Sequence, residues 1–159
     1  DLAALRDGPR AAFRRARIGL VVQEPLLFEE LSAPENAALT ALYAPAAARG
    51  EIADRAEAAL ARLGLGTAGR RASASYSGGE RQRIAVARAL AGDPAVLLAD
   101  EPTASLDRAN ADRLSADLIA LSREAGRTLI VASHDPALMA LADRVIDLRD
   151  GVIAGEQHG

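Results

Sequence analysis

Residues 75–107 constrain the fold of this chain more than any other stretch, because several short motifs follow one another there. A turn of small residues, Ser75-Tyr76-Ser77-Gly78-Gly79, precedes an arginine-rich segment from Glu80 to Leu90 that has helical character. The sequence Gly92-Asp93-Pro94 ends this helix, and an apolar strand from Ala95 to Ala99 leads to the acidic pair Asp100-Glu101. A strand of this kind, next to helices, indicates an α/β fold in which the sheet is mainly parallel.

The same stretch carries residue types that suit a nucleoside triphosphate. Glycines let backbone N–H groups approach an anion closely, and the start of a helix adds about half a positive charge there. Adjacent carboxylates at the end of a strand suit a magnesium ion and an attacking water molecule.

The composition limits the size of the domain and the kinds of partner that the chain can have. The length of 159 residues is that of a single domain, and half of the residues are apolar while only 3% are aromatic. The net charge of −3 and the pI near 5.4 argue against a surface that binds mainly nucleic acid. The absence of cysteine excludes disulfides, and no apolar run reaches the roughly 18–20 residues of a membrane helix. We therefore expect a cytoplasmic protein with no nucleic-acid partner.

The chain contains 19 arginines and no lysine. A P-loop needs the lysine of G-x-x-x-x-G-K-[ST] to reach the β- and γ-phosphates. These residues therefore contain no Walker A motif of their own.

The remaining chain alternates short strands and helices. We expect strands at 17–22, 128–132 and 144–148, a hairpin turn at Asp150-Gly151, and helices at 11–16, about 33–43, 51–63, 107–124 and 137–142. Ser32 and Glu35 have the spacing of a capping box. The apolar strands predict burial within the sheet.

The 75–107 stretch resembles the signature-to-D-loop block of ABC-type ATPases, the nucleotide-binding subunits of ABC transporters. The signature is Tyr76-Ser77-Gly78-Gly79-Glu80, the Walker B strand is AVLLADE, and the D-loop is Ser105-Leu106-Asp107. IGLVVQ, which ends at Gln23, resembles the Q-loop, and His134 resembles the H-switch. Several motifs in the correct order are far more specific than any single one.

The resemblance implies a P-loop NTPase-like (RecA-like) α/β fold with an inserted helical subdomain, and ATP and Mg²⁺ as ligands. Glu101 and His134 would be catalytic, and Asp100 and Gln23 would hold the metal. Gln23, Ser77, Gly78, Gly79 and Asp107 would contact nucleotide, with the signature closing over ATP held by a second ATPase domain in a head-to-tail dimer. The partners would be that second domain and a transmembrane permease, docked near Gln23 and residues 31–63 at the inner face of the cell membrane.

Two signature positions depart from the family's usual residues, since Tyr76 replaces leucine and the fifth position is Glu80, a variant common in some exporter-type subfamilies. We expect Arg81, Arg83 and Arg88 to lie on a solvated helix face. The segments LLADEPTASLD and VASHDPALMALADRVIDLRDGVI are most similar to the branch of the family that serves lipoprotein release and macrolide export.

The resemblance covers 1–153 but not the start of the family's domain, so we expect an N-terminally incomplete ABC ATPase domain. Residues 24–75 would form the Q-loop and helical subdomain, and 76–159 the signature, Walker B, D-loop and H-switch part of the core. The chain alone would then be inactive and expose apolar sheet surface. A non-catalytic fragment or a partner that supplies only the signature in trans is the alternative. A DNA-repair ATPase is disfavoured because only 52 residues separate Gln23 from Tyr76 and no heptads or cysteines occur.

Overall fold

The computed structural model describes residues 2–66, 72 and 75–158. Its elements follow in the order α1 (Asp7–Arg17), β1 (Ile18–Val21), α2 (Ala33–Ala37), η1 (Leu39–Tyr43), η2 (Ala46–Ala48), α3 (Arg49–Arg62), α4 (Gly78–Ala91), β2 (Val96–Asp100), α5 (Arg108–Glu124), β3 (Thr128–Ala132), α6 (Pro136–Met139), β4 (Arg144–Arg149) and β5 (Val152–His158). The alternation of strands and helices predicted from the sequence is confirmed. Arg70 and Arg71, which belong to the loop before the signature, lie outside the described residues.

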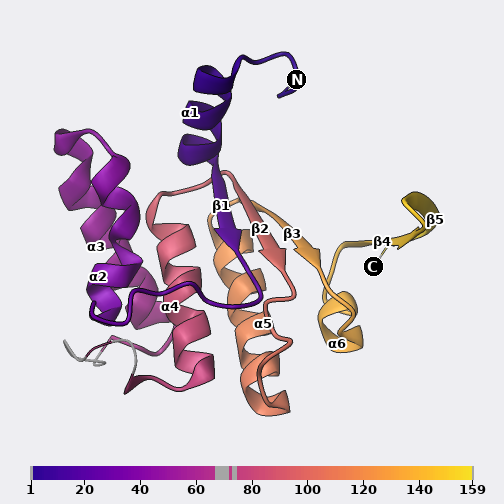
Figure 1. Cartoon of the computed structure of the whole chain (residues 1–159). Helices are drawn as coiled ribbons and strands as arrows, with labels where there is room; N and C mark the ends of the chain where they lie inside the picture. The colour runs from indigo at the N-terminus through magenta and orange to yellow at the C-terminus, as the bar shows by residue number, and fades with distance from the viewer. Residues whose placement is uncertain (1, 67–71, 73–74, 159) are drawn as a thin grey trace.

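Within the described residues, a parallel sheet has the strand order β1-β2-β3, so β2 is central (Figure 1). The register pairs Leu20 with Leu98 and Leu98 with Ile130. Strands β4 and β5 form a separate antiparallel hairpin beyond α6, with the predicted Asp150-Gly151 turn at its tip. The parallel register places the carboxyl ends of β1, β2 and β3 along one edge of the sheet.

One face of the sheet packs on helices. Gly19 lies so close to α4 that an added Cβ would meet the carbonyl oxygen of Ala89 at 2.8 Å, which explains why β1 has glycine there. Helices α4 and α5 contact β1 and β3 respectively, and their side chains complete a core with the inward residues of β2. The core side chains without solvent exposure include Leu63, Ile84, Leu97, Leu114 and Leu118.

On the opposite face of the sheet two expectations diverge, because an incomplete domain should expose apolar sheet surface while the strand pattern alone predicts burial, and the structure agrees with the first. The apolar strands predicted burial, yet Leu20 is 58% exposed and Ile130 is 55% exposed. Strand side chains alternate between the two faces, and among the described residues helices cover the face that bears Leu97 and Ala99. The prediction of buried strands is therefore correct for one face and wrong for the other.

Two predicted helices have different bounds in the structure. The capping box at Ser32 and Glu35 is present, with Glu35 Oε2 accepting from the Ser32 N–H at 2.8 Å. The helix it starts ends at Ala37, because Ala38 (φ −84°, ψ 3°) leaves α-helical geometry and the chain tightens into the 3₁₀ turn η1. The helix predicted at 137–142 is α6, which begins at Pro136 with Asp135 as its N-cap and is shorter.

Candidate functional site at the carboxyl edge of the sheet

The centre of the site is Glu101, which follows the last residue of β2. Its backbone lies in the left-handed region with φ 43°, and its N–H donates to the Ala132 carbonyl at 2.9 Å. A non-glycine residue held in this region costs on the order of 1–3 kcal/mol, and such positions cluster at functional sites. The strained turn directs Glu101 toward the loop that follows β3.

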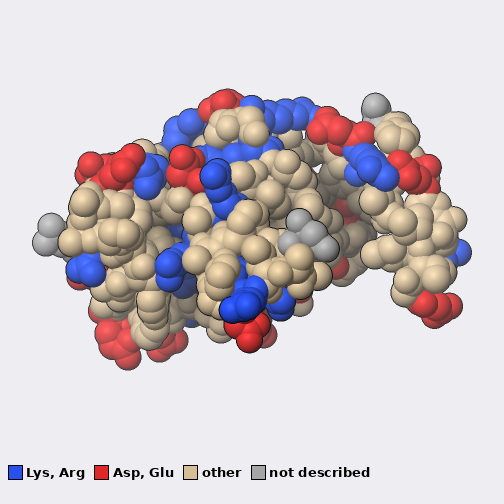
Figure 2. All heavy atoms as spheres, turned by 90° about the horizontal axis from the view of Figure 1, so that it is seen from above, with Lys and Arg blue, Asp and Glu red and all other residues tan. Residues whose placement is uncertain are grey.

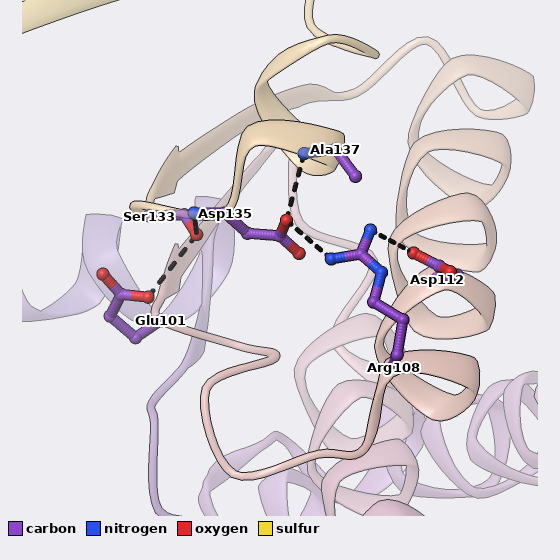
Figure 3. Close-up of polar contacts among 6 residues, drawn as sticks. All are labelled: Glu101, Arg108, Asp112, Ser133, Asp135 and Ala137. Carbon is purple, nitrogen blue, oxygen red and sulfur yellow. Dashed lines mark hydrogen bonds and ion pairs between the residues drawn. The ribbon is translucent and has the colours of Figure 1, made fainter.

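That loop holds the Glu101 carboxylate by two side chains. His134 Nδ1 lies 2.6 Å from Glu101 Oε1. The Ser133 hydroxyl donates to Glu101 Oε2 at 3.4 Å (Figure 3). The Glu101 side chain is 23% exposed and that of His134 is 85% exposed, so the carboxylate is partly shielded while the ring is open to solvent. The two residues predicted as catalytic therefore lie in direct contact.

Asp135 anchors the same loop to α5 and α6. Its carboxylate accepts from Arg108 Nη1 at 3.1 Å and from the Ala137 N–H at 3.0 Å, while its own N–H donates to Ser133 Oγ at 3.1 Å (Figure 3). Arg108 also pairs with Asp112 at 2.5 Å. The Arg108 hydrogen bond and then the Ala137 N–H hold the pKa of Asp135 below its ordinary value, and the two carboxylates raise the pKa of Arg108.

This pKa shift predicts a pH-dependent stability. Because the folded-state pKa of Asp135 is lowered, its stabilising effect is present above the unfolded-state value of about 3.9 and is lost as pH falls through the folded value. Asp135→Asn should therefore lower the urea midpoint at pH 6, and the difference from wild type should stay constant down to about pH 5 and then shrink toward pH 3. Asp54→Asn, at an exposed position of α3, is the control. A difference that stays constant between pH 6 and pH 3 would contradict the assignment.

The signature turn begins α4. Ser77 is the N-cap and Glu80 completes a capping box, with Glu80 Oε2 accepting from the Ser77 N–H at 2.8 Å and from its hydroxyl at 2.9 Å. Ser77 and Gly78 are exposed, whereas Gly79 is buried against α5, where an added Cβ would lie 3.3 Å from Asn110 Cγ. The start of this helix is suited to an anion because the N–H groups of its first turn carry a partial positive charge.

Asp107 of the predicted D-loop caps α5. Its carboxylate accepts from the Asn110 N–H at 3.0 Å and from Asn110 Nδ2 at 2.6 Å. These two bonds, the backbone one first, lower the pKa of Asp107. Asn110 also accepts from Arg83 Nη1 at 3.3 Å, so the predicted D-loop and signature helix meet at one side chain.

The prediction that the α4 arginines form a solvated face is wrong. Arg83 is 9% exposed and bonds to Asn110, while Arg88 donates to the Leu26 carbonyl at 2.5 Å and burial lowers its pKa. Arg81 is partly buried and lies 3.9 Å from Glu29. Helical periodicity indicates a polar face but not that loops and a second helix pack on it.

Gln23 and Asp100 are the predicted oxygen ligands of magnesium. Val21 pairs with Ala99, so Asp100, the last residue of β2, and Gln23, two residues after β1, lie at neighbouring strand ends, and both are exposed. Among the residues that the structure describes, no group of three His, Cys, Asp or Glu side chains forms a metal site. Two oxygen donors nonetheless suit Mg²⁺, which usually keeps several waters and takes one or two carboxylates together with phosphate oxygens.

Four contacts that build this region were not predicted from the sequence. They involve Gln82, which donates to the Val22 carbonyl at 3.1 Å, together with Arg108, Asn110 and Ser133. Each joins segments at least 27 residues apart in the chain, for which local sequence patterns hold no signal. The only available signal was adjacency, since Arg108 follows the predicted D-loop and Ser133 precedes His134.

Acidic side chains at the carboxyl edge of a parallel sheet, where ligands bind in open α/β sheets, place the chain in the class of nucleotide-binding α/β domains. Within that class the chain belongs to the ABC transporter family, whose sequence profile matches residues 3–104. The expected family and its lipoprotein-release and macrolide-export-like branch are confirmed.

Curated relatives of both kinds are similar over nearly the whole chain. The lipoprotein-releasing system ATP-binding protein LolD of Porphyromonas gingivalis is 40% identical over 156 residues, which cover 98% of this chain and 71% of that protein. The macrolide export ATP-binding/permease protein MacB of Bradyrhizobium diazoefficiens is 42% identical over 158 residues, which cover 99% of this chain. The chain spans 24% of that MacB protein.

Solved structures agree with the fold. The ATP-binding cassette MJ0796, in a dimeric post-hydrolysis state bound to ADP and Pi, superposes with a TM-score of 0.80 at 32% identity, covering 98% of this chain and 68% of that one. A bacterial cassette structure of cbiO1 from Clostridium perfringens gives a TM-score of 0.84 at 27% identity, covering 96% of this chain and 61% of that one. The predicted ABC cassette fold is therefore confirmed. In the described part of the chain, no helix is both long enough and apolar enough to span a bilayer.

Proposed function

We propose that this chain is the signature and Walker B part of an ATP-hydrolysing subunit that powers an ABC transporter of the lipoprotein-release or macrolide-export type. The observation that carries the proposal is the Glu101 carboxylate, held at the carboxyl edge of the sheet by His134 at 2.6 Å and flanked by Asp100. Phosphoryl transfer needs an aligned water and charge stabilisation rather than covalent help from the protein, and these side chains are of the types that supply both.

Each predicted residue then has a role. Glu101 orients and deprotonates the attacking water, and His134 contacts the γ-phosphate from the exposed side of the carboxylate. Asp100 and Gln23 would hold Mg²⁺, which supplies charge neutralisation between the phosphates when bound. Ser133 fixes the second oxygen of Glu101, so that one carboxylate oxygen is directed by each neighbour.

The signature residues Ser77, Gly78 and Gly79 serve the nucleotide of a second ATPase domain in a head-to-tail dimer, with Asp107 at the same interface. Support comes from the exposed start of α4 and from the dimeric state named for the MJ0796 cassette. Ser77 would exchange the two hydrogen bonds that it donates to Glu80 for bonds to phosphate.

We further propose that residues 24–75 form the helical subdomain and 76–159 the core part, and that a permease holds the chain at the inner face of the membrane. The docking surface lies between the segment after Gln23 and the 3₁₀ turn η1. Its support is a set of exposed apolar side chains on those two segments, Leu26, Phe28, Leu42 and Tyr43. Exposed apolar side chains of this size are compatible with a protein contact site.

The test uses a hybrid cassette in which this chain replaces the matching segment of the Porphyromonas gingivalis LolD relative. The hybrid should bind ATP and hydrolyse it in a magnesium-dependent manner, while residues 1–159 alone, which contain no lysine, should not bind ATP tightly by calorimetry. A hybrid that melts cooperatively but neither binds nor hydrolyses ATP would refute the proposed function. Tight ATP binding by residues 1–159 alone would refute the expected dependence on a separate phosphate-binding loop.

The exposed Ser77-Gly78 turn also favours a second candidate, supply of the signature in trans. A hybrid carrying Ser77→Arg should lose hydrolysis, because an arginine side chain would occupy the place of the phosphate donors. If the chain acts in trans, adding residues 1–159 should restore hydrolysis, whereas adding residues 1–159 with Ser77→Arg should not. No recovery with either addition would count against this candidate.

A further inference from the structure

The first turn of α5 has two arms that reach different parts of the proposed site. Arg108 extends to Asp135 at 3.1 Å in the loop after β3, the loop whose Ser133 and His134 hold Glu101. Figure 3 shows this arm running from α5 through Arg108 and Asp135 toward Ser133 and Glu101. A change at Arg108 therefore reaches the Glu101 carboxylate through two further residues.

The second arm is Asn110, which leaves the same turn toward α4. Its side chain accepts from Arg83, donates to Asp107 at 2.6 Å and packs against Gly79 so closely that an added Cβ there would lie 3.3 Å from Asn110 Cγ. Arg83 is nearly buried, so this arm is enclosed between the two helices. The position of Gly79 thus depends on the side chain of Asn110.

The two arms begin within one helical turn, and Asp107 caps that turn by accepting from the Asn110 N–H at 3.0 Å. An N-cap satisfies backbone N–H groups of the first turn, so this cap holds the turn that carries both residues. Arg108 and Asn110 are two residues apart in that turn, so its backbone joins the two arms.

We propose that Arg108 and Asn110 are positioning residues that couple the Glu101–His134 pair to the Ser77–Gly79 turn of the same chain. This rests on the proposed function, in which Glu101 serves one ATP and the signature serves another. The first turn of α5 then links Glu101, which acts on one ATP, to the signature residues, which contact the other. A structural change at one ATP site would therefore alter the other site.

A direct test is amide hydrogen exchange on residues 1–159, read in peptides that cover 75–83 and 131–138. If the two residues acted only locally, Arg108→Gln would raise the amide exchange rate only in 131–138, and Asn110→Ala would raise it only in 75–83. Coupling predicts that each variant also raises exchange, by about threefold or more, in the distant peptide, because opening free energies are shared within a cooperative unit. Arg123→Gln is the matched control, since Arg123 forms an exposed ion pair with Asp143 at 2.6 Å from the other end of α5.

Two results would overturn the proposal: effects confined to each variant's own peptide, or the same distant effect in Arg123→Gln. Arg108→Lys keeps a cation for Asp135 and should retain near wild-type exchange, which separates loss of the ion pair from general destabilisation. The exchange measurement uses no nucleotide, so its result does not depend on ATP hydrolysis by the hybrid. The coupling can therefore be refuted while the proposed function holds, and the reverse is also possible.

Kinetics of the hybrid give a second measure. Arg108→Gln and Asn110→Ala should each lower kcat by about tenfold with less than a twofold change in the KM for ATP, and the double variant should lose clearly less than the product of the two losses. Strictly multiplicative losses would show that the two residues act independently and would overturn the coupling.

Discussion

Glu101→Gln in the hybrid cassette is expected to lower kcat for ATP hydrolysis by about 10²–10⁴-fold, the range that a positioned general base contributes. The amide has the same shape and can keep a hydrogen bond to His134, but it cannot accept a proton from water. The Glu101 side chain is partly shielded and its backbone N–H bonds to the Ala132 carbonyl, which holds the carboxylate in one place. The measurement is steady-state phosphate release at saturating MgATP.

The KM for ATP should change by less than about threefold, because Glu101 acts on the water rather than on nucleotide affinity. Glu124→Gln is the control, since Glu124 forms an exposed ion pair with Arg62 at 2.6 Å away from the sheet edge. If Glu101→Gln hydrolysed ATP at a rate within a few-fold of the unaltered hybrid, another group would have to be the base and the proposed role would be wrong.

The contact between Glu101 and His134 shows how far a sequence can predict a site. Both residues were expected to be catalytic from the resemblance to ABC-type ATPases, and their places just after apolar strands agree with it, since parallel strands bring their carboxyl ends to one edge. What could not be predicted is the support around them. The Arg108–Asp135 ion pair and the Arg83–Asn110 bond join surfaces of separate elements, and their partners depend on how α4, α5 and the β3 loop are placed in space.

For the fold, too, the local features could be predicted from the sequence, whereas the features that depend on tertiary packing could not. The strand at 128–132 has the predicted bounds, and Ser77 and Asp107 start helices because their side chains satisfy backbone N–H groups. The apolar run of β3 could not reveal which of its faces would be covered, because that depends on the number of layers that pack on the sheet. The sequence pattern is consistent with two covered faces, and the described residues cover one.

The uncovered face leads to a prediction about the isolated chain. Leu20, Leu98 and Ile130 lie in register across the three strands, and Leu20 and Ile130 are more than half exposed. Figure 2, which views the molecule from above relative to Figure 1, shows acidic and basic side chains interspersed among broad uncharged areas. An exposed apolar row on a sheet with two open edges favours pairing of chains, since both the side chains and the unpaired backbone groups gain partners.

Residues 1–159 should therefore associate, with a sedimentation coefficient that rises with concentration over about 1–100 μM. The variant Leu20→Ser/Ile130→Ser removes two apolar groups from the row at positions that do not contact the helical core, so it should sediment as a monomer over this range and retain a cooperative thermal transition. Leu42→Ser is the matched control, because Leu42 is 65% exposed but lies on η1, away from the sheet. It should associate as the unaltered chain does. A wild-type chain that is monomeric throughout, with a melting temperature independent of concentration, would show that the open sheet face does not drive self-association.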